Sequence, residues 1–292
     1  MKKLLVAVSA IAVIWGVGLN ANASPQGDLE TTRNHFKAKY PKLKRADYGD
    51  GVYAIDQERR KAWLEWLDFE PPFSLGLAHG KKLFHGKFAN GKTYADCFKN
   101  RGHGIRQEFP YFDPEKGKVV TIEGAINECR ERNSEKPLDW AKGDMAVISA
   151  YMSSTSAGKR VNVKVPNDPR ALAIYERGKR HFYAKRGQLN FSCGDCHIHN
   201  AGNMVRTDLL SPVIGQTTHF PVWRLAWAKE AEEEGNTGIM RGFGTLQRRY
   251  KGCNEQVRAK GFALQSDEYV ALEYFHQYLS NGVPINARML RQ

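Results

Sequence analysis

The 292-residue chain is poor in long apolar runs, in cysteine and in acidic residues. Only one stretch, at the N-terminus, approaches membrane length, and the mean hydropathy is −0.55, which excludes a polytopic membrane protein. Five cysteines are too few for a disulfide-stapled miniprotein. A content of 41% hydrophobic and 11% aromatic residues argues against a disordered or collagen-like chain. The length therefore allows two packed domains of roughly 100–150 residues each.

The one apolar stretch has the layout of a secretory signal peptide. Lys2 and Lys3 form a charged start, residues 4–19 are almost wholly apolar, and Ala21-Asn22-Ala23 is a small-residue cleavage site. An uncleaved anchor helix is the alternative, but the apolar core is short for it. We therefore predict that residues 1–23 are removed and that the mature protein is periplasmic and not embedded in a membrane.

Acidic residues are outnumbered, with 31 Asp and Glu against 44 Lys and Arg, for a net charge of +13. Removal of residues 1–23, which carry two lysines, leaves 269 residues at about +11. Because an exported protein does not meet nucleic acid, this charge points to an acidic protein or a small anion as partner.

Cys193-Gly194-Asp195-Cys196-His197 is a C-x-x-C-H motif, the attachment signature of c-type haem. Two thiols at this spacing can add to the two vinyl groups of one porphyrin, and the adjacent imidazole can bind the iron. We predict covalent haem on Cys193 and Cys196, with His197 as axial ligand. The alternative is a disulfide-forming C-x-x-C beside an incidental histidine.

The chain contains an internal repeat. The segment 80–84 resembles 178–182, and Cys97 follows its glycine by about the same distance as Cys196 follows Gly178. In this register Tyr94 and Phe98 occupy the positions of the first haem cysteine and the histidine. The first half is thus predicted to be a cytochrome c unit whose haem site has decayed.

A first unit without haem leaves Cys97 and Cys129 free. Oxidising conditions and the parity of the remaining cysteines favour a disulfide between them. Apolar residues recur at helical spacing over 145–152 and over 269–279, the latter after the plausible cap Ser266. These stripes are interpreted as ordinary core, and His276, within the second, as a core or surface histidine rather than a ligand.

Cys253 is left single, in a segment where residues 241–260 carry six cations and one acid. Positive charges stabilise a thiolate, and a thiolate is a strong ligand of haem iron. Two alternatives stay open at this point: a spare cysteine on a solvated basic surface, and methionine ligation of the iron by Met204 or Met240.

These features together resemble the SoxA family, the catalytic cytochrome subunits of the SoxAX complex of bacterial sulfur oxidation. The resemblance covers nearly the whole mature chain, and its most specific element is the segment Arg248-Arg249-Tyr250-Lys251-Gly252-Cys253. It implies that Cys253 ligates the haem iron and carries a persulfide, and that Arg249 holds the substrate. The departures at Tyr94 and Phe98 resemble the single-haem variety, in which the two leftover cysteines are bridged.

The resemblance also implies a reaction, in which thiosulfate is joined oxidatively to a cysteine of the carrier protein SoxYZ. One haem takes one electron at a time, so a second redox centre is needed, and the small cytochrome SoxX is the implied partner. Two other functions agree with part of these features: a plain periplasmic electron carrier with His/Met ligation, and a thiosulfate dehydrogenase that forms tetrathionate.

The predicted fold is mainly α-helical, with two tandem class-I-type cytochrome c domains. An N-terminal extension, residues 24–72, contains an amphipathic helix over 56–67. The degenerate unit spans 73–157 and the haem-binding catalytic unit 166–292, joined by a linker at 158–169. Residues 230–244 show no assignable pattern.

Overall fold

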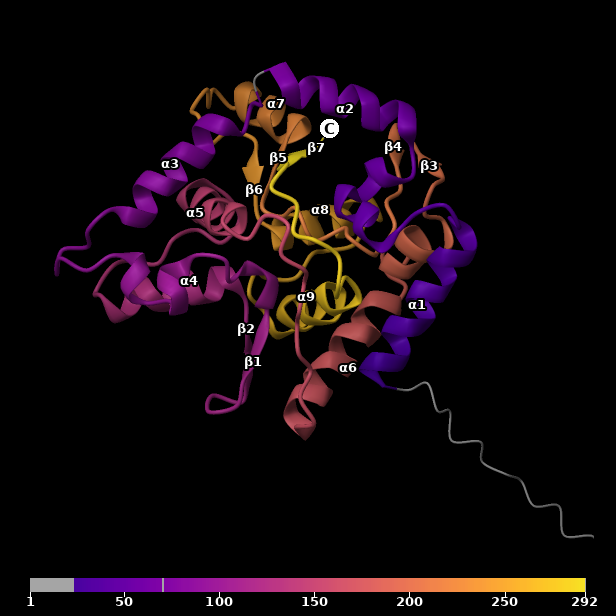
Figure 1. The fold of residues 1–292 in the computed structure, drawn as a ribbon, viewed down its shortest axis with the longest axis horizontal. Helices are drawn as coiled ribbons and strands as arrows, with labels where there is room; N and C mark the ends of the chain where they lie inside the picture. The colour runs from indigo at the N-terminus through magenta and orange to yellow at the C-terminus, as the bar shows by residue number, and fades with distance from the viewer. Residues whose placement is uncertain (1–23, 70, 292) are drawn as a thin grey trace, which may run out of the picture.

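The computed structural model describes residues 24–69 and 71–291 (Figure 1). The predicted signal peptide, residues 1–23, lies outside the described residues. The described chain is mainly α-helical, as predicted, and its strands are short.

The N-terminal extension packs on both halves of the molecule: its first helix lies on the second half, and its later part joins a core cluster with residues of both halves. Helix α1 (Pro25–Lys39) begins at Ser24, whose hydroxyl accepts a backbone hydrogen bond and caps the helix. Its Leu29 and Phe36 are buried in the core of the second half. Figure 1 shows α1, in indigo, beside the C-terminal elements.

A 3₁₀ segment, η1 (Arg45–Ala54), leads to helix α2 (Gln57–Phe69). The amphipathic pattern over 56–67 predicted this helix, which is confirmed. Its Trp63 is fully buried, and the indole Nε1 donates a hydrogen bond to the Leu290 carbonyl at 3.1 Å. The extension is therefore tied to the C-terminal end of the chain.

The first half contains the helices α3 (Ser74–His85), α4 (Ile122–Arg132) and α5 (Gly143–Ser154). The helix predicted over 145–152 is α5. Helices α3 and α5 cross in close contact, because a Cβ on Gly80 would lie 2.0 Å from the Val147 carbonyl oxygen. Only a glycine permits this approach.

Aromatic side chains fill the core beneath this crossing. Tyr94, in the short turn η2 (Tyr94–Asp96), is stacked on Phe84 with ring centroids 5.9 Å apart. The Asp96 carboxylate accepts hydrogen bonds from the Thr93 amide and hydroxyl and so holds the turn. Two further 3₁₀ turns follow, η3 (Lys99–Gly102) and η4 (Arg106–Glu108).

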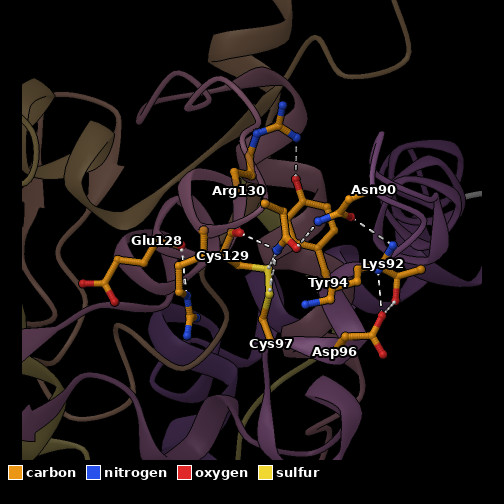
Figure 2. Close-up of a disulfide and its surroundings, with 11 residues drawn as sticks. Asn90, Lys92, Tyr94, Asp96, Cys97, Glu128, Cys129 and Arg130 are labelled. Atoms are coloured by element: carbon orange, nitrogen blue, oxygen red, sulfur yellow. Dashed lines mark hydrogen bonds between the residues drawn. A yellow bond between two sulfur atoms is a disulfide. The ribbon is translucent and has the colours of Figure 1, made fainter.

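The predicted disulfide between Cys97 and Cys129 is present and joins η2 to α4 (Figure 2). The Asn133 side chain donates to the Cys129 carbonyl at 2.8 Å beside it. Figure 2 shows Tyr94 next to the bridge, with Arg130 donating to the Tyr94 hydroxyl at 2.8 Å. Side chains and a disulfide thus occupy the position that corresponds to the haem motif of the second half.

The two halves are joined by packed chain. The antiparallel hairpin of β1 (Tyr111–Asp113) and β2 (Lys118–Val120) buries Phe112 and Val119 in the core of the second half. The predicted linker, 158–169, pairs its backbone with residues 282–285 and buries two of its valines. It is an integrated segment and not a loose tether.

The second half contains α6 (Pro169–Tyr183), α7 (Leu225–Glu233), α8 (Leu246–Gln256) and α9 (Asp267–Leu279). Helix α9 is the one predicted over 269–279, and Ser266 caps it by accepting from the Tyr269 amide. The region 230–244 comprises the end of α7, a loop and the two-residue strand β6 (Phe243–Gly244).

Helices α6 and α9 cross as α3 and α5 do. A Cβ on Gly178 would lie 2.0 Å from the Ala271 carbonyl oxygen, the same contact that Gly80 makes in the first half. A small sheet completes this half, with strand order β6 (Phe243–Gly244), β5 (Val222–Arg224) and β7 (Leu290–Arg291).

Candidate haem and sulfur-transfer site

The C-x-x-C-H segment forms one wide turn, η5 (Asp195–His199), after α6. The Asp195 carboxylate accepts hydrogen bonds from the amide and hydroxyl of Ser192, the same arrangement as Thr93 and Asp96 in the first half. The turn places Cys193, Cys196 and His197 on the wall of one cavity of about 550 Å³. That volume is typical of a cofactor or ligand site.

His197 is oriented by the chain that follows it. Its Nδ1 donates to the Ser211 carbonyl at 3.0 Å, which leaves Nε2 as the atom able to bind iron. The side-chain nitrogen of Gln216 lies 3.2 Å from Nε2. Burial lowers the pKa of His197 to about 4, so the ring stays in the neutral form that ligates metals.

Helix α8 brings the second group of predicted residues to the same cavity. Thr245 caps it, and Leu246, Arg249, Tyr250 and Cys253 line the cavity together. Their spacing of three, four and seven residues puts them on one helical face. The structure thus places Cys253 and Arg249 in one site with the haem motif.

Cys253 lies close to the two haem-motif cysteines. Burial raises the pKa of Cys193 to about 12, and Cys253 adds to the effect as a neighbouring negative charge. The pKa of Cys196 is raised by the same two causes, in the same order. Neutral thiols are therefore favoured at both positions before they are alkylated by a porphyrin.

The positive charge of the site comes from several segments. Of the six cations in 241–260, only Arg249 lines the cavity; Arg241 pairs with Glu232 at 2.7 Å and Arg248 with Glu230 at 3.5 Å. Other cavity arginines come from distant parts of the chain: Arg59, Arg186, Arg206, Arg224 and Arg291. The segment 241–260 therefore contributes less positive charge to the cavity than its six cations predicted.

Arg249 is available to a ligand. Among residues 24–69 and 71–291 it forms no ion pair, and its guanidinium contacts only the Gln256 side chain, at 3.4 Å. Its charge acts on Cys196, His197 and Arg224, which lowers the pKa of each of these groups as a cause after burial. The guanidinium therefore lies at the reactive end of the cavity.

The residues present fit a covalently held haem. The donor set of two thiols and a neutral imidazole is that of c-type attachment. Two buried polar atoms of the wall, Nε2 of His276 and Oε1 of Gln216, have no hydrogen-bond partner within the described chain and would meet polar groups of a bound cofactor. The apolar wall includes Leu210, Phe220, Val222, Leu246 and Leu272.

The two candidate methionines differ in position. Met204, in the hairpin of β3 (Met204–Val205) and β4 (Asp208–Leu209), lines the cavity and is 48% exposed. Met240 instead packs in a cluster with Trp223 and Phe243, away from the cavity wall.

Sequence reasoning missed two parts of this site. His276, predicted to be a core or surface histidine, is buried at 4% exposed, but it also lines the cavity, and its Nδ1 interacts with the Tyr250 hydroxyl at 2.9 Å. Arg224 was not singled out at all. The helical spacing of Leu246, Tyr250 and Cys253 is visible in the sequence and indicates the helix α8. No motif or spacing near Arg224 indicates that it belongs to the site.

Comparisons with known proteins agree with this geometry. A family model described as SoxA/TsdA, cytochrome c domain, matches residues 79–161, which lie in the first half and before the C-x-x-C-H motif. L-cysteine S-thiosulfotransferase subunit SoxA of Chlorobaculum tepidum is 45% identical over 274 residues, which cover 94% of this chain and 90% of the relative. The protein of that name from Allochromatium vinosum is 41% identical, with 92% and 91% covered.

A solved structure shows the same likeness. The crystal structure of SoxXA from P. pantotrophus aligns with a TM-score of 0.66 at 32% identity, over 77% of this chain and 80% of that chain. Within the described residues, the helices are too short or too polar for any to cross a membrane.

Proposed function

Since this chain belongs to the SoxA family of L-cysteine S-thiosulfotransferase subunits, we propose that it joins thiosulfate to a cysteine of a carrier protein in an oxidative step. The observation that carries the proposal is the shared face of α8, which presents Arg249 and Cys253 to the cavity of Cys193, Cys196 and His197.

The proposed cofactor is one haem c, attached to Cys193 and Cys196, with His197 and Cys253 as axial ligands. When bound, it supplies a one-electron acceptor beside the sulfur chemistry. The first half is proposed to be a degenerate cytochrome c unit without haem. The matching glycine crossings and the matching Asp-held turns support a tandem origin of the two halves.

Cys253 is the proposed sulfur-carrying residue, as a persulfide, because a thiol at this position can exchange sulfur with a disulfide-like partner. Arg249 is proposed to bind the sulfonate oxygens with its planar fork of donors. The absence of an ion pair at Arg249 within the described residues leaves those donors available.

The reaction balances as follows. A sulfur–sulfur bond forms between the carrier cysteine and the outer sulfur of thiosulfate, the thiol proton is released, and two electrons leave. We propose SoxYZ as the carrier and a SoxX-type cytochrome as the partner that receives electrons; the structural neighbour is itself a SoxXA complex. A periplasmic location follows from the predicted signal peptide.

Substitutions at the shared face of α8 test the proposal. Cys253→Ala should abolish carrier-dependent conjugation and change the EPR spectrum of the haem. Cys253→Met could keep a low-spin haem while losing sulfur transfer, because a thioether ligates iron but forms no persulfide. Retention of both the wild-type EPR spectrum and full conjugation in Cys253→Ala would overturn the assignment.

Arg249→Ala should leave the haem spectrum nearly intact and slow turnover roughly ten- to hundred-fold, since a lost charge-assisted hydrogen bond costs about 1.5–3 kcal/mol. The matched control is Lys251→Ala, which removes a cation of the same helix that does not line the cavity. Equal slowing in both variants would show that only overall charge matters.

Two observations favour other functions strongly enough to test. Met204 also lines the cavity, so a plain electron carrier with His/Met ligation predicts that Met204→Ala, and not Cys253→Ala, changes the EPR spectrum. The matching family model is shared by SoxA and TsdA proteins. Formation of tetrathionate from thiosulfate is therefore the second activity to assay. Thiosulfate oxidation at full rate without any carrier protein would favour that reaction.

A further inference from the structure

Two buried carboxylates meet between the halves of the molecule, outside the site described above. Glu123 on α4 is 4% exposed and Glu273 on α9 is 1% exposed. Their hydrogen-bond donors are neutral: the Ser149 hydroxyl donates to Glu123 at 2.9 Å, and the Gln247 amide donates to Glu273 at 2.9 Å. Neither carboxylate is in an ion pair within the described residues.

The charged and titratable groups that face the pair do not neutralise two negative charges. Arg106, from η4, is 2% exposed and attracts Glu273, but it gives its hydrogen bond to the Phe109 carbonyl. Tyr250, from α8, is a further titratable neighbour. Burial, and then the charge of Glu273, raise the pKa of its hydroxyl, so it stays neutral. Two buried negative charges beside one cation are unstable in a low dielectric, so the pair retains a proton.

The electrostatics agree with this geometry. Burial, and then the neighbouring Glu123, raise the pKa of Glu273 to about 8. One proton is therefore shared by the pair at neutral pH and is lost just above it.

The pair lies directly behind the wall of the haem cavity. On α9, Leu272 and His276 flank Glu273 and line the cavity, and on α8 Leu246 and Tyr250 flank Gln247 and line it too. One helix thickness, about 10 Å, therefore separates the carboxylates from the cavity. At such a distance through protein, a charge added in the cavity acts on the pair.

The pair also has a connection to solvent. A groove of about 450 Å³ runs between the halves and is lined by Thr121 and Gln265. The Gln265 amide donates to the Gln247 side chain at 2.7 Å, and Gln247 in turn donates to Glu273. Glu273 is thus two hydrogen bonds from a residue of the groove wall, which places the pair near solvent.

We propose that Glu123 and Glu273 form a buried proton-binding site that takes up a proton when the haem is reduced and releases it when the haem is oxidised. The inference rests on the haem binding in the proposed function, and it assigns these residues no contact with sulfur substrates. Near and above pH 8, where the pair has lost its proton, the pair would gain up to one proton from solvent for each electron that the bound haem takes up. Both leave again when the electron passes to the partner.

The test is the pH dependence of the haem midpoint potential, measured by spectroelectrochemistry from pH 6 to 9 on the full haem-loaded protein. The wild-type potential should fall as pH rises, most steeply near pH 8. Glu273→Gln, which mimics the protonated acid, should match the wild type at pH 6, lie above it at pH 9, and lose the slope. The control, Glu115→Gln, removes an exposed carboxylate in the β1–β2 turn and should keep the wild-type slope.

An unchanged slope in Glu273→Gln, or a flat wild-type profile, would overturn the proposal. A measurement on the wild type alone guards against a variant that fails to fold. Reduction at an electrode in weakly buffered solution near pH 8, followed with a pH indicator, should take up a fraction of a proton per haem, and no uptake overturns the proposal equally. No sulfur compound is used, so a failed carrier assay leaves this result intact, and missing haem shows at once in the spectrum.

Discussion

The two halves of this molecule share a framework and differ in what it encloses. In each half two helices cross at a glycine that touches a backbone carbonyl, Gly80 in the first and Gly178 in the second. In each half a hydroxyl residue and an aspartate hold the following turn. Beneath the first crossing lie packed aromatic rings and a disulfide, and beneath the second lies a cavity lined by thiols and an imidazole.

This difference shows that the same helix crossing can lie over packed side chains or over a cavity. In the predicted repeat register Tyr94 corresponds to Cys193, and its ring packs on Phe84, so side chains supply the apolar contacts of the first core. The disulfide then cross-links the turn to α4. The space beneath such a crossing can thus be filled by the protein's own residues.

The largest difference between the halves is expected in haem content when the cysteines of each half are replaced. Cys193→Ala with Cys196→Ala should eliminate all covalent haem, because only these cysteines lie beside a histidine at the required spacing. Cys97→Ala with Cys129→Ala should leave the haem content at one per chain. Intact mass and the pyridine haemochrome spectrum measure both, and a mass increase of two haems in the wild type would contradict a haem-free first half.

The next largest effect is expected on stability. Loss of the Cys97–Cys129 bridge should lower the free energy of unfolding by roughly 3–4 kcal/mol, since the bridge closes a loop of 32 residues. Denaturant unfolding under oxidising conditions, followed by tryptophan fluorescence, measures it. The wild type with and without reductant serves as a comparison. An unchanged free energy of unfolding in both the variant and the reduced wild type would show that the bridge does not stabilise the first half.

The two glycine crossings can be compared directly. Gly80→Ala and Gly178→Ala should each cost about 1–3 kcal/mol or more, because each Cβ would meet a carbonyl oxygen at 2.0 Å. Only Gly178→Ala should also alter the haem absorption spectrum. Gly252→Ala is the control, since its Cβ meets nothing closer than 3.7 Å and alanine favours a helix interior.

The smallest effect concerns the carboxylate pair that the halves share. The pKa of Glu273 is raised to about 8 in the folded protein, so the folded state holds a proton that the unfolded state loses above its ordinary pKa near 4.5. Stability should therefore fall as pH rises from about 4.5 to 8, by at most about 1.4 kcal/mol per pH unit from this group. Unfolding midpoints across this range should be flatter for Glu273→Gln; an equal slope would exclude Glu273 as the source.

Local patterns in the sequence were sufficient for much of this architecture. The helices α2, α5 and α9 follow from apolar spacing and, for α9, from the Ser266 cap, because these signals act over a few residues. The C-x-x-C-H motif is equally local. The disulfide required a repeat register and the count of cysteines, and the structure contains it.

The packing of the N-terminal extension could not be predicted from local sequence patterns. Nothing near α1 or Trp63 indicates that they reach the second half, because the contacts that place them there are with residues more than a hundred positions away. The prediction of a linker at 158–169 did not include its packing, for the same reason: its pairing with residues 282–285 is a contact between distant segments.

The sequence by itself determined the chemistry that this protein carries: two thiols and an imidazole at haem spacing, a single further cysteine, and an arginine four residues before it. These features depend only on residues that are close to one another in the sequence. Tertiary structure alone decided the environment of that chemistry. It brought Arg59 and Arg224 to the cavity while Arg241 and Arg248 went to acids elsewhere, and it buried Glu123 against Glu273. The physical reason is that burial and electrostatic potential depend on which distant segments meet, and no local spacing specifies that.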